Sequence, residues 1–197
     1  MQESKQNAPA RLYFIAVVLP PHIDEKVLQY KRQMQALYGC KVGLKSPAHI
    51  TLVPPFWMEE EKEVALRKDI EQLALSLPAF SLATAGFAAF KPRTIFVAVE
   101  ENEALHQLKK RSDAFFRGKE YKMKTENRPF HPHITIATRD LHKNAFWEAW
   151  PRFEKEPFLE TANVNGLSLL RHNGRAWDVV FTVPFQHATP ADFATQQ

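Results

Sequence analysis

Hydrophobic and polar residues alternate with the period of a β-strand at two places in the chain. The stretches His49-Ile50-Thr51-Leu52 and His133-Ile134-Thr135-Ile136 show the same order of residue types, 84 residues apart. In an extended strand, successive side chains point to opposite faces. Each stretch therefore predicts a strand that buries two aliphatic side chains and presents one imidazole and one hydroxyl on its other face.

Other apolar runs predict the remaining strands. Leu12–Leu19 is continuously apolar and has the length of a buried strand, which Pro20-Pro21 should end. The first motif strand is likewise expected to end at Pro54-Pro55. Further strands are expected over residues 80–90, 94–100, 131–138, 158–172 and 176–185. Asn173-Gly174 predicts a hairpin turn between the last two.

Apolar residues at intervals of three or four predict the helices. They are expected over residues 22–38, 59–77, 101–117 and 142–155, and a loop is expected over 41–48. Gly39 is a candidate for the residue that ends the first helix. Each motif strand is followed by a helix and then by two strands, which indicates an internal duplication. We predict an α+β fold with two lobes, in which two mainly antiparallel sheets face a central cleft and the helices lie outside.

Composition predicts a single globular domain over residues 10–187, with a disordered tail over 1–9 and a mobile tail over 188–197. Hydrophobic residues make up 45% of the 197 residues, which is enough for a core. No apolar run approaches the roughly 20 residues of a membrane helix, and the polar N-terminus lacks the apolar region of a signal peptide. Cys40 is the only cysteine, which excludes an internal disulfide. We expect a cytoplasmic monomer that does not bind membranes.

Positive charge is concentrated before the second motif. The chain carries a net charge of +4, and residues 109–128 contain eight basic and three acidic residues. This segment is either a solvated helix face followed by a loop, or an electrostatic rim that attracts a phosphate backbone. The sequence leaves both interpretations open.

Two imidazoles on facing strands suit the chemistry of a phosphodiester. A single histidine on a strand is more often structural than catalytic, but the repeated pattern favours a paired site. One neutral and one protonated imidazole can act as general base and general acid. Threonine hydroxyls beside them can donate to the phosphoryl oxygens, where charge must be stabilised.

Both motifs resemble those of the two-histidine phosphoesterase superfamily, in the branch of the 2′-5′ RNA ligase-like and RNA 2′,3′-cyclic phosphodiesterase proteins. That family is marked by two His-x-Thr/Ser-x motifs on strands of a bilobal α+β fold. Residues Phe130–Ala137 match a longer form of its second motif. The resemblance implies a catalytic pair and a set of phosphate-binding residues. The pair is His49 and His133, and the phosphate-binding residues are Thr51, Thr135 and Arg139.

The resemblance also implies a reaction. A 2′,3′-cyclic phosphate at the end of an RNA or a small nucleotide is opened to a 2′-phosphomonoester, without a metal or another cofactor. Ligation of 2′-5′ ends is the reverse chemistry in the same site. We first assign His133 as the base toward water and His49 as the acid toward the 3′-oxygen. The partners would be RNA ends or cyclic nucleotides. The alternative is a non-catalytic RNA- or nucleotide-binding module of the same fold.

Several other residues are weaker candidates for the site. His131 could join His49 and His133 in a metal site, although Pro132 intervenes and no carboxylate accompanies the motif. Lys91, Arg93 and Arg128 are either phosphate contacts or surface charges, and Phe56, Trp57 and Trp177 could stack on a base. The remaining histidines are expected to be structural. They are His22, His106, His142, His172 and His187.

Overall fold

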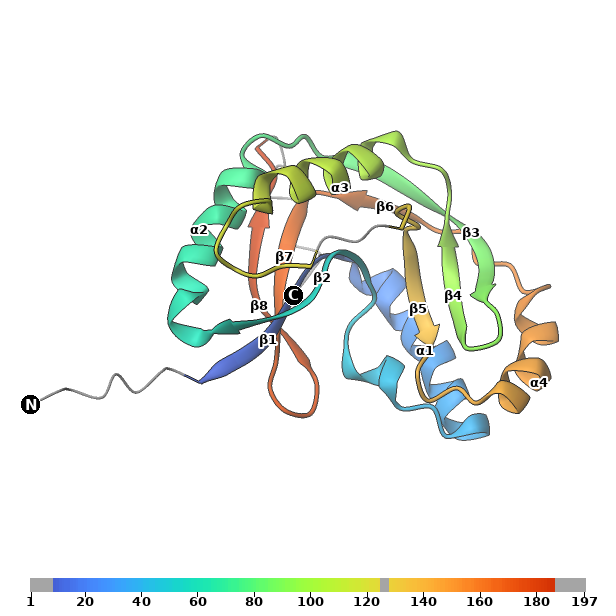
Figure 1. The fold of residues 1–197 in the computed structure, drawn as a ribbon. Coiled ribbons are helices and arrows are strands. Elements are labelled where there is room, and N and C mark those ends of the chain that lie inside the picture. The colour runs from blue at the N-terminus through green and yellow to red at the C-terminus, as the bar shows by residue number, and fades with distance from the viewer. Residues whose placement is uncertain (1–8, 125–127, 187–197) are drawn as a thin grey trace, which may run out of the picture.

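The computed structural model describes residues 9–124 and 128–186, and contains two antiparallel sheets, four α-helices and two 3₁₀ turns (Figure 1). The strands are β1 (Ala10–Val18), β2 (His49–Glu59), β3 (Phe80–Phe90), β4 (Thr94–Val99), β5 (His133–Ala137), β6 (Thr161–Val164), β7 (Gly166–His172) and β8 (Trp177–Pro184). The helices are α1 (Pro21–Tyr38), α2 (Glu63–Ala74), α3 (Glu103–Phe116) and α4 (Lys143–Phe153), and the 3₁₀ turns are η1 (Val42–Lys45) and η2 (Glu60–Lys62). The tails expected over 1–9 and 188–197 lie, apart from residue 9, outside the described residues.

Each sheet has four strands, in the orders β2-β1-β7-β8 and β5-β4-β3-β6. The two motif strands, β2 and β5, are edge strands of their sheets and contact each other. The sheets therefore meet along these two strands (Figure 1). This arrangement brings together two motifs that lie far apart in the sequence.

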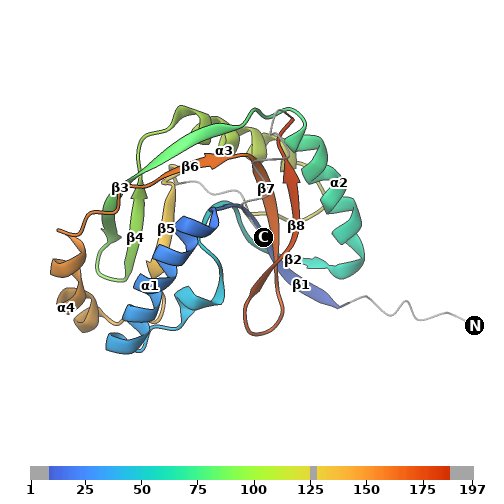
Figure 2. The same ribbon diagram turned by 180° about the vertical axis from the view of Figure 1, so that it is seen from behind.

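Two helices cover the outer side of each sheet. Helix α1 contacts β5, and α4 contacts β4. Helix α2 contacts β7 and β8, and α3 contacts β2. Figure 2 shows the same division from behind. The predicted α+β fold of two antiparallel sheets with outer helices is thus confirmed. No helix in the described part of the chain is long and apolar enough to cross a membrane.

The alternation predicted for the motif strands is also confirmed. The four aliphatic side chains Ile50, Leu52, Ile134 and Ile136 are at most 1% exposed and belong to one hydrophobic cluster that spans both sheets. The histidines and threonines between them are partly exposed on the opposite face. Burial of the aliphatic side chains fixes the register, because a slip of one residue would turn the imidazoles into the core.

The prediction that Pro54-Pro55 ends the first motif strand is wrong, since β2 continues to Glu59. A proline lacks a backbone N–H, and it is tolerated in an edge strand, where no second neighbour needs that donor. The pairing of β2 with β1 shifts its register beside this dipeptide, between Tyr13 and Ile15 of β1.

The strand predicted over 158–172 is two strands that belong to different sheets. β6 pairs with β3, and β7 pairs with β1 and β8. Gly166 lies where the chain crosses, and a Cβ atom on it would be 2.5 Å from the carbonyl oxygen of Val183. Since the first sheet combines strands from both ends of the chain, the two sheets are not two consecutive halves of the sequence.

The helix predicted over 59–77 is shorter than expected. Its first residues form β2 and η2, and α2 begins at Glu63. The loop predicted over 41–48 contains the turn η1, and His131 lies before β5 instead of within it. Gly39 ends α1 with a φ of 71°, as predicted. Asn173 accepts hydrogen bonds from the N–H groups of residues 175 and 176, which closes the predicted β7–β8 turn.

Candidate active site

The first half of the site is built on β2 around His49. Its Nδ1 lies 2.8 Å from the carbonyl oxygen of Pro47. A carbonyl only accepts, so Nδ1 carries the hydrogen and Nε2 of the neutral ring carries the lone pair. The ring also packs against Phe14 of the neighbouring strand β1, with 4.8 Å between the centroids. Backbone and aromatic contacts together fix the orientation of the imidazole.

The second half, on β5, repeats this arrangement. Nδ1 of His133 lies 2.7 Å from the carbonyl oxygen of His131, which is again two residues earlier in the chain. Its ring packs against Phe96 of the neighbouring strand β4, with centroids 5.0 Å apart, and against Phe90, at 5.2 Å. The two histidines thus have equivalent backbone partners and equivalent aromatic neighbours.

The two halves line two pockets that share one residue. His49, Thr51 and Thr135 line one pocket. Thr51 also lines a second pocket, together with His133. The first pocket is completed by Phe14, Val42, Gly43, Ser46, Pro55, Thr138, Arg139 and Trp177. The structure therefore brings the four motif side chains to one site, and it adds Arg139 to them.

Two extensions lead away from this centre. One lies beside the first sheet and is lined by Lys45, Arg139, His172 and Trp177, among others. The other is the rest of the His133 pocket, which is also lined by Phe90 of β3 and by Arg128, Phe130 and His131. Each extension combines cationic and aromatic side chains, which suits a ligand that carries phosphate and flat rings.

The electrostatic surroundings of His49 favour its neutral form. Burial lowers the pKa of His49 to about 4. The hydrogen bond to Pro47 acts in the opposite direction, whereas the positive charges of Lys31 and His133 lower the pKa further. At neutral pH the His49 imidazole is therefore uncharged and able to accept a proton.

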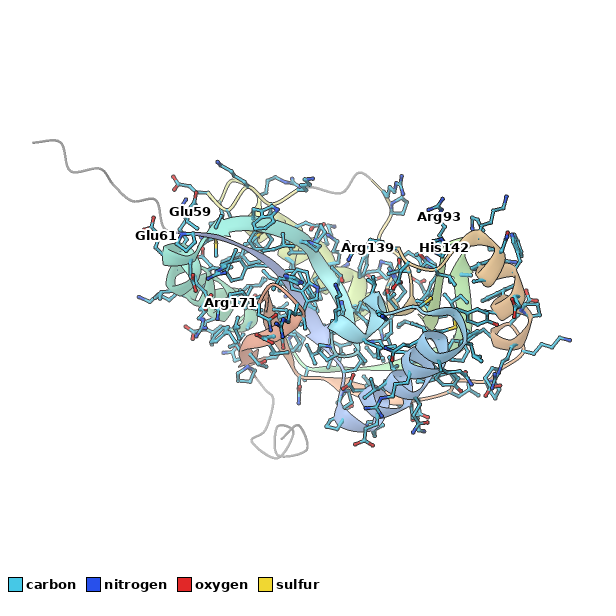
Figure 3. The ribbon with its side chains drawn as sticks, turned by 90° about the horizontal axis from the view of Figure 1, so that it is seen from below. Glu59, Glu61, Arg93, Arg139, His142 and Arg171 are labelled. Carbon is cyan, nitrogen blue, oxygen red and sulfur yellow. The ribbon has the colours of Figure 1, made fainter. Side chains whose placement is uncertain are left out.

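The weaker candidates separate into residues inside and outside the site. Trp177 and Arg128 line its extensions. Phe56 is 3% exposed in the core, and Trp57 is 65% exposed on β2. The ammonium of Lys91 lies over the ring of Trp150 on α4. Figure 3 shows Arg139 between the two halves of the molecule and Arg93 farther toward α4.

The basic residues of the segment 109–128 also include some that line the site and some that lie outside it. Lys109 pairs with Asp113 within α3, and Lys119 pairs with Asp69 of α2. Arg111 donates to the backbone of Ser76. These three side chains belong to the packing of the helices, whereas Arg128 lines the site.

The donor set of the site does not form a metal centre in the described part of the chain. No group of three or more histidine, cysteine, aspartate or glutamate side chains is placed there to hold a metal ion. His131 is exposed, and its ring centroid lies 6.5 Å from that of His133.

Sequence reasoning missed several residues that line the site. Gly43 and Ser46 come from the η1 region, Phe90 from the end of β3, and His172 from the end of β7. None of them belongs to a repeated pattern, and they reach the site only because the two sheets meet. For Gly43 and Ser46, the sequence offered one indication: both lie in the short loop predicted over 41–48, directly before the first motif strand.

The amino-acid sequence is similar to those of known phosphoesterases. A sequence profile described as the 2′-5′ RNA ligase superfamily matches residues 19–176. A protein of Geobacillus thermodenitrificans named as a phosphoesterase is 33% identical over 141 residues, which cover 69% of this chain and 77% of that protein. The RNA 2′,3′-cyclic phosphodiesterase of Bacillus subtilis is 25% identical over 138 residues, covering 68% of this chain and 74% of that enzyme.

Solved structures share the fold. The LigT protein of E. coli, in complex with 3′-AMP, is similar with a TM-score of 0.65 at 18% identity, over 91% of this chain and 100% of LigT. TT0787 of Thermus thermophilus is similar with a TM-score of 0.62 at 21% identity, also over 91% of this chain and 100% of TT0787. At these levels of identity the likeness concerns the fold alone.

Proposed function

Because the chain belongs to the 2′-5′ RNA ligase superfamily, we propose that it is a metal-independent phosphodiesterase that opens 2′,3′-cyclic phosphate ends of RNA or small nucleotides. One observation carries the proposal most strongly. Two imidazoles, each held by a carbonyl two residues earlier, line two pockets that both include Thr51 in their walls. A general base and a general acid on opposite sides of one phosphorus atom require such a pair.

The reaction proceeds by displacement at phosphorus. Nε2 of His49 takes a proton from water, and the water oxygen forms a bond to phosphorus. The bond from phosphorus to the 3′-oxygen breaks, and His133 protonates that oxygen. The hydroxyls of Thr51 and Thr135 and the guanidinium of Arg139 stabilise the charge on the remaining phosphoryl oxygens. The product is a 2′-phosphomonoester. Ligation with a 2′-5′ linkage is the same displacement with a 5′-hydroxyl in the place of water: the 5′-oxygen bonds to phosphorus and the 3′-oxygen leaves.

The assignment of His49 as the base reverses the first expectation from the sequence, which made His133 the base. Two motifs with the same residues give no basis for distinguishing the two rings. Burial and neighbouring positive charge, which favour the neutral form of the His49 ring, support His49 as the base. A neutral ring can accept a proton from water, and a protonated ring can donate one.

The pH dependence of the free enzyme follows from this assignment. We expect kcat/KM to stay high as the pH falls through 6, and to decrease only as His49 becomes protonated, near its pKa of about 4. The measurement is kcat/KM on a 2′,3′-cyclic nucleotide between pH 3.5 and 9. An acidic limb centred near the ordinary imidazole value, about 6.5, would contradict the role of His49 as the base.

Trp177 is expected to bind the nucleobase. Its ring lies against Phe14 and His172, with centroids 4.6 and 5.0 Å apart, and it lines the extension beside the first sheet. Stacking of a base on an aromatic ring contributes about 1–3 kcal/mol. Trp177→Ala should therefore raise KM by about tenfold and leave kcat nearly unchanged. Trp147→Ala, at an exposed position on α4, is the matched control. An unchanged KM in Trp177→Ala would exclude this role.

The substrate class is tested with a panel of compounds. It contains 2′,3′-cyclic mononucleotides, oligoribonucleotides with a cyclic phosphate end, ADP-ribose cyclic phosphate and 2′-5′ oligoadenylate. We expect hydrolysis of the cyclic phosphates, scored by the position of the phosphate in the product. Tight binding of RNA ends without turnover would instead favour a nucleotide-binding module of the same fold.

A further inference from the structure

A buried lysine lies behind the active site. Lys31 is on α1 and is 3% exposed. Its Nζ donates to the carbonyl oxygen of Ser46 at 2.9 Å. Its stem lies beside the pocket residue Gly43, since a Cβ atom on that glycine would be 3.5 Å from Cγ of Lys31. Burying an ammonium without a carboxylate partner is unfavourable, so its presence here calls for an explanation.

The buried lysines of the described chain are Lys31 and Lys109, and they differ in their partners. Lys109 forms an ion pair with Asp113 within α3. Lys31 donates to a neutral carbonyl. Its positive charge is therefore less fully compensated than that of Lys109, and it repels positive charge on neighbouring groups.

The three residues that precede His49, residues 46–48, lie next to Lys31. Side chains of α1 form hydrogen bonds with the first and the last of them. Lys31 binds the carbonyl of Ser46, and Oδ1 of Asp24, two turns earlier on the helix, accepts from the N–H of Ala48 at 2.5 Å. The carbonyl between them, that of Pro47, accepts from Nδ1 of His49. The backbone group that orients the His49 ring is thus fixed by two charged side chains of α1.

The charged groups that face His49 come from α1, from β5 and from the residues after β5. Lys31 of α1 and His133 of β5 both act on it, and Arg139 lines the same pocket. Asp24 of α1 lies near Lys31 and favours its charged form. Lys31 binds the carbonyl next to the one that holds His49, so its charge lies close to this imidazole.

We propose that Lys31 is a positioning residue that fixes the segment before His49 and disfavours protonation of the His49 ring, which supports the division of the two motif imidazoles into base and acid. The division into base and acid rests on the proposed function, whereas the effect of Lys31 on His49 does not. Desolvation lowers the pKa of Lys31 to about 8, which leaves it mostly charged at neutral pH. The charge that acts on His49 is therefore present where the enzyme would work.

The test is an NMR titration of the His49 ring without substrate, with the signal assigned by its loss in His49→Gln. Lys31→Met removes the charge and keeps the length of the side chain. We expect it to raise the pKa of His49 by about one unit, because a nearby positive charge has been removed. Lys31→Arg retains the charge and should leave the pKa close to that of the wild type. Lys26→Met, at an exposed lysine of the same helix, is the matched control and should change nothing.

The same variants distinguish an effect on folding from an effect on the pKa of His49. Lys31→Met removes the cost of burying an ammonium but leaves the carbonyl of Ser46 without this donor, so the melting temperature of each variant is measured alongside the titration. If Lys31→Met does not fold, Lys31→Gln takes its place in the titration. An unchanged pKa of His49 in either folded neutral variant would overturn the proposal. Should the wild type hydrolyse no cyclic phosphate, the proposed function fails, and the titration still decides the effect of Lys31.

Where hydrolysis is observed, a kinetic readout accompanies the titration. We expect the acidic limb of kcat/KM to move to higher pH in Lys31→Met by the same amount as the pKa of His49, and to stay in place in Lys26→Met. A uniform loss of activity at all pH values, without a shift of this limb, would show a structural role only and would contradict the proposal.

Discussion

Replacing either His49 or His133 with glutamine should lower kcat for a 2′,3′-cyclic nucleotide by about 10³-fold. Glutamine retains a polar side chain, but it can neither accept nor supply a proton as an imidazole does. The two rings act in one displacement, so the double variant should be little worse than either single variant. KM should change much less than kcat, since the threonines and Arg139 remain to hold the phosphate. Steady-state kinetics on the four proteins provide the measurement.

The control for these variants is a histidine outside the site. His142 precedes α4 and is exposed, and Figure 3 places it on the side of this helix. His142→Gln should retain the activity of the wild type. Turnover near the wild-type level in His49→Gln or His133→Gln would disprove paired acid–base catalysis, whatever the substrate.

A second large effect is expected from Gly43→Ala. A Cβ atom on Gly43 would lie 2.3 Å from the carbonyl oxygen of Ile136, a backbone atom of β5 that cannot move away easily. The turn η1 must therefore shift from β5. We expect the free energy of unfolding to fall by about 1–3 kcal/mol and the melting temperature to decrease by several degrees. Activity should fall as well, because Val42 and Gly43 line the pocket.

Gly166→Ala is the matched control for this effect. Its Cβ atom would meet a backbone carbonyl at 2.5 Å, but at the β6–β7 crossing, away from the pocket residues. We expect a similar loss of stability without a change in KM. Melting curves and KM are measured together on both proteins. If Gly43→Ala has the stability and KM of the wild type, η1 is not seated on β5 as described.

Local pattern was sufficient to predict the motif strands and most of the helices. The alternation in His49–Leu52 and His133–Ile136 determines which side chains are buried, and burial determines which face the imidazoles occupy. Pattern did not reveal that β2 continues past Pro54-Pro55. That continuation depends on β2 being an edge strand, which is a property of the sheet order and not of the local sequence.

The sequence was sufficient to name the histidines and threonines of the candidate site, but not the different surroundings of the two histidines. The motifs supplied the two histidines and two threonines, and family resemblance added Arg139. The roles of Lys31 and Asp24 could not be predicted, because each reaches a backbone group of the segment before His49 from one face of α1. Helical spacing marks position 31 as inward-facing, but it does not indicate which backbone group a lysine there would bind. Two motifs with the same residues therefore gave no sign that a buried lysine lies behind one of them.

The central claim is that the two imidazoles open a 2′,3′-cyclic phosphate by attack of water and departure of the 3′-oxygen. The direct measurement is ³¹P NMR of the product from a 2′,3′-cyclic mononucleotide, with excess chelator to remove metal ions. We predict a single product resonance, that of the 2′-phosphomonoester, formed at the same rate with and without chelator. A 3′-phosphomonoester, or a reaction that stops when the chelator is added, would contradict the account.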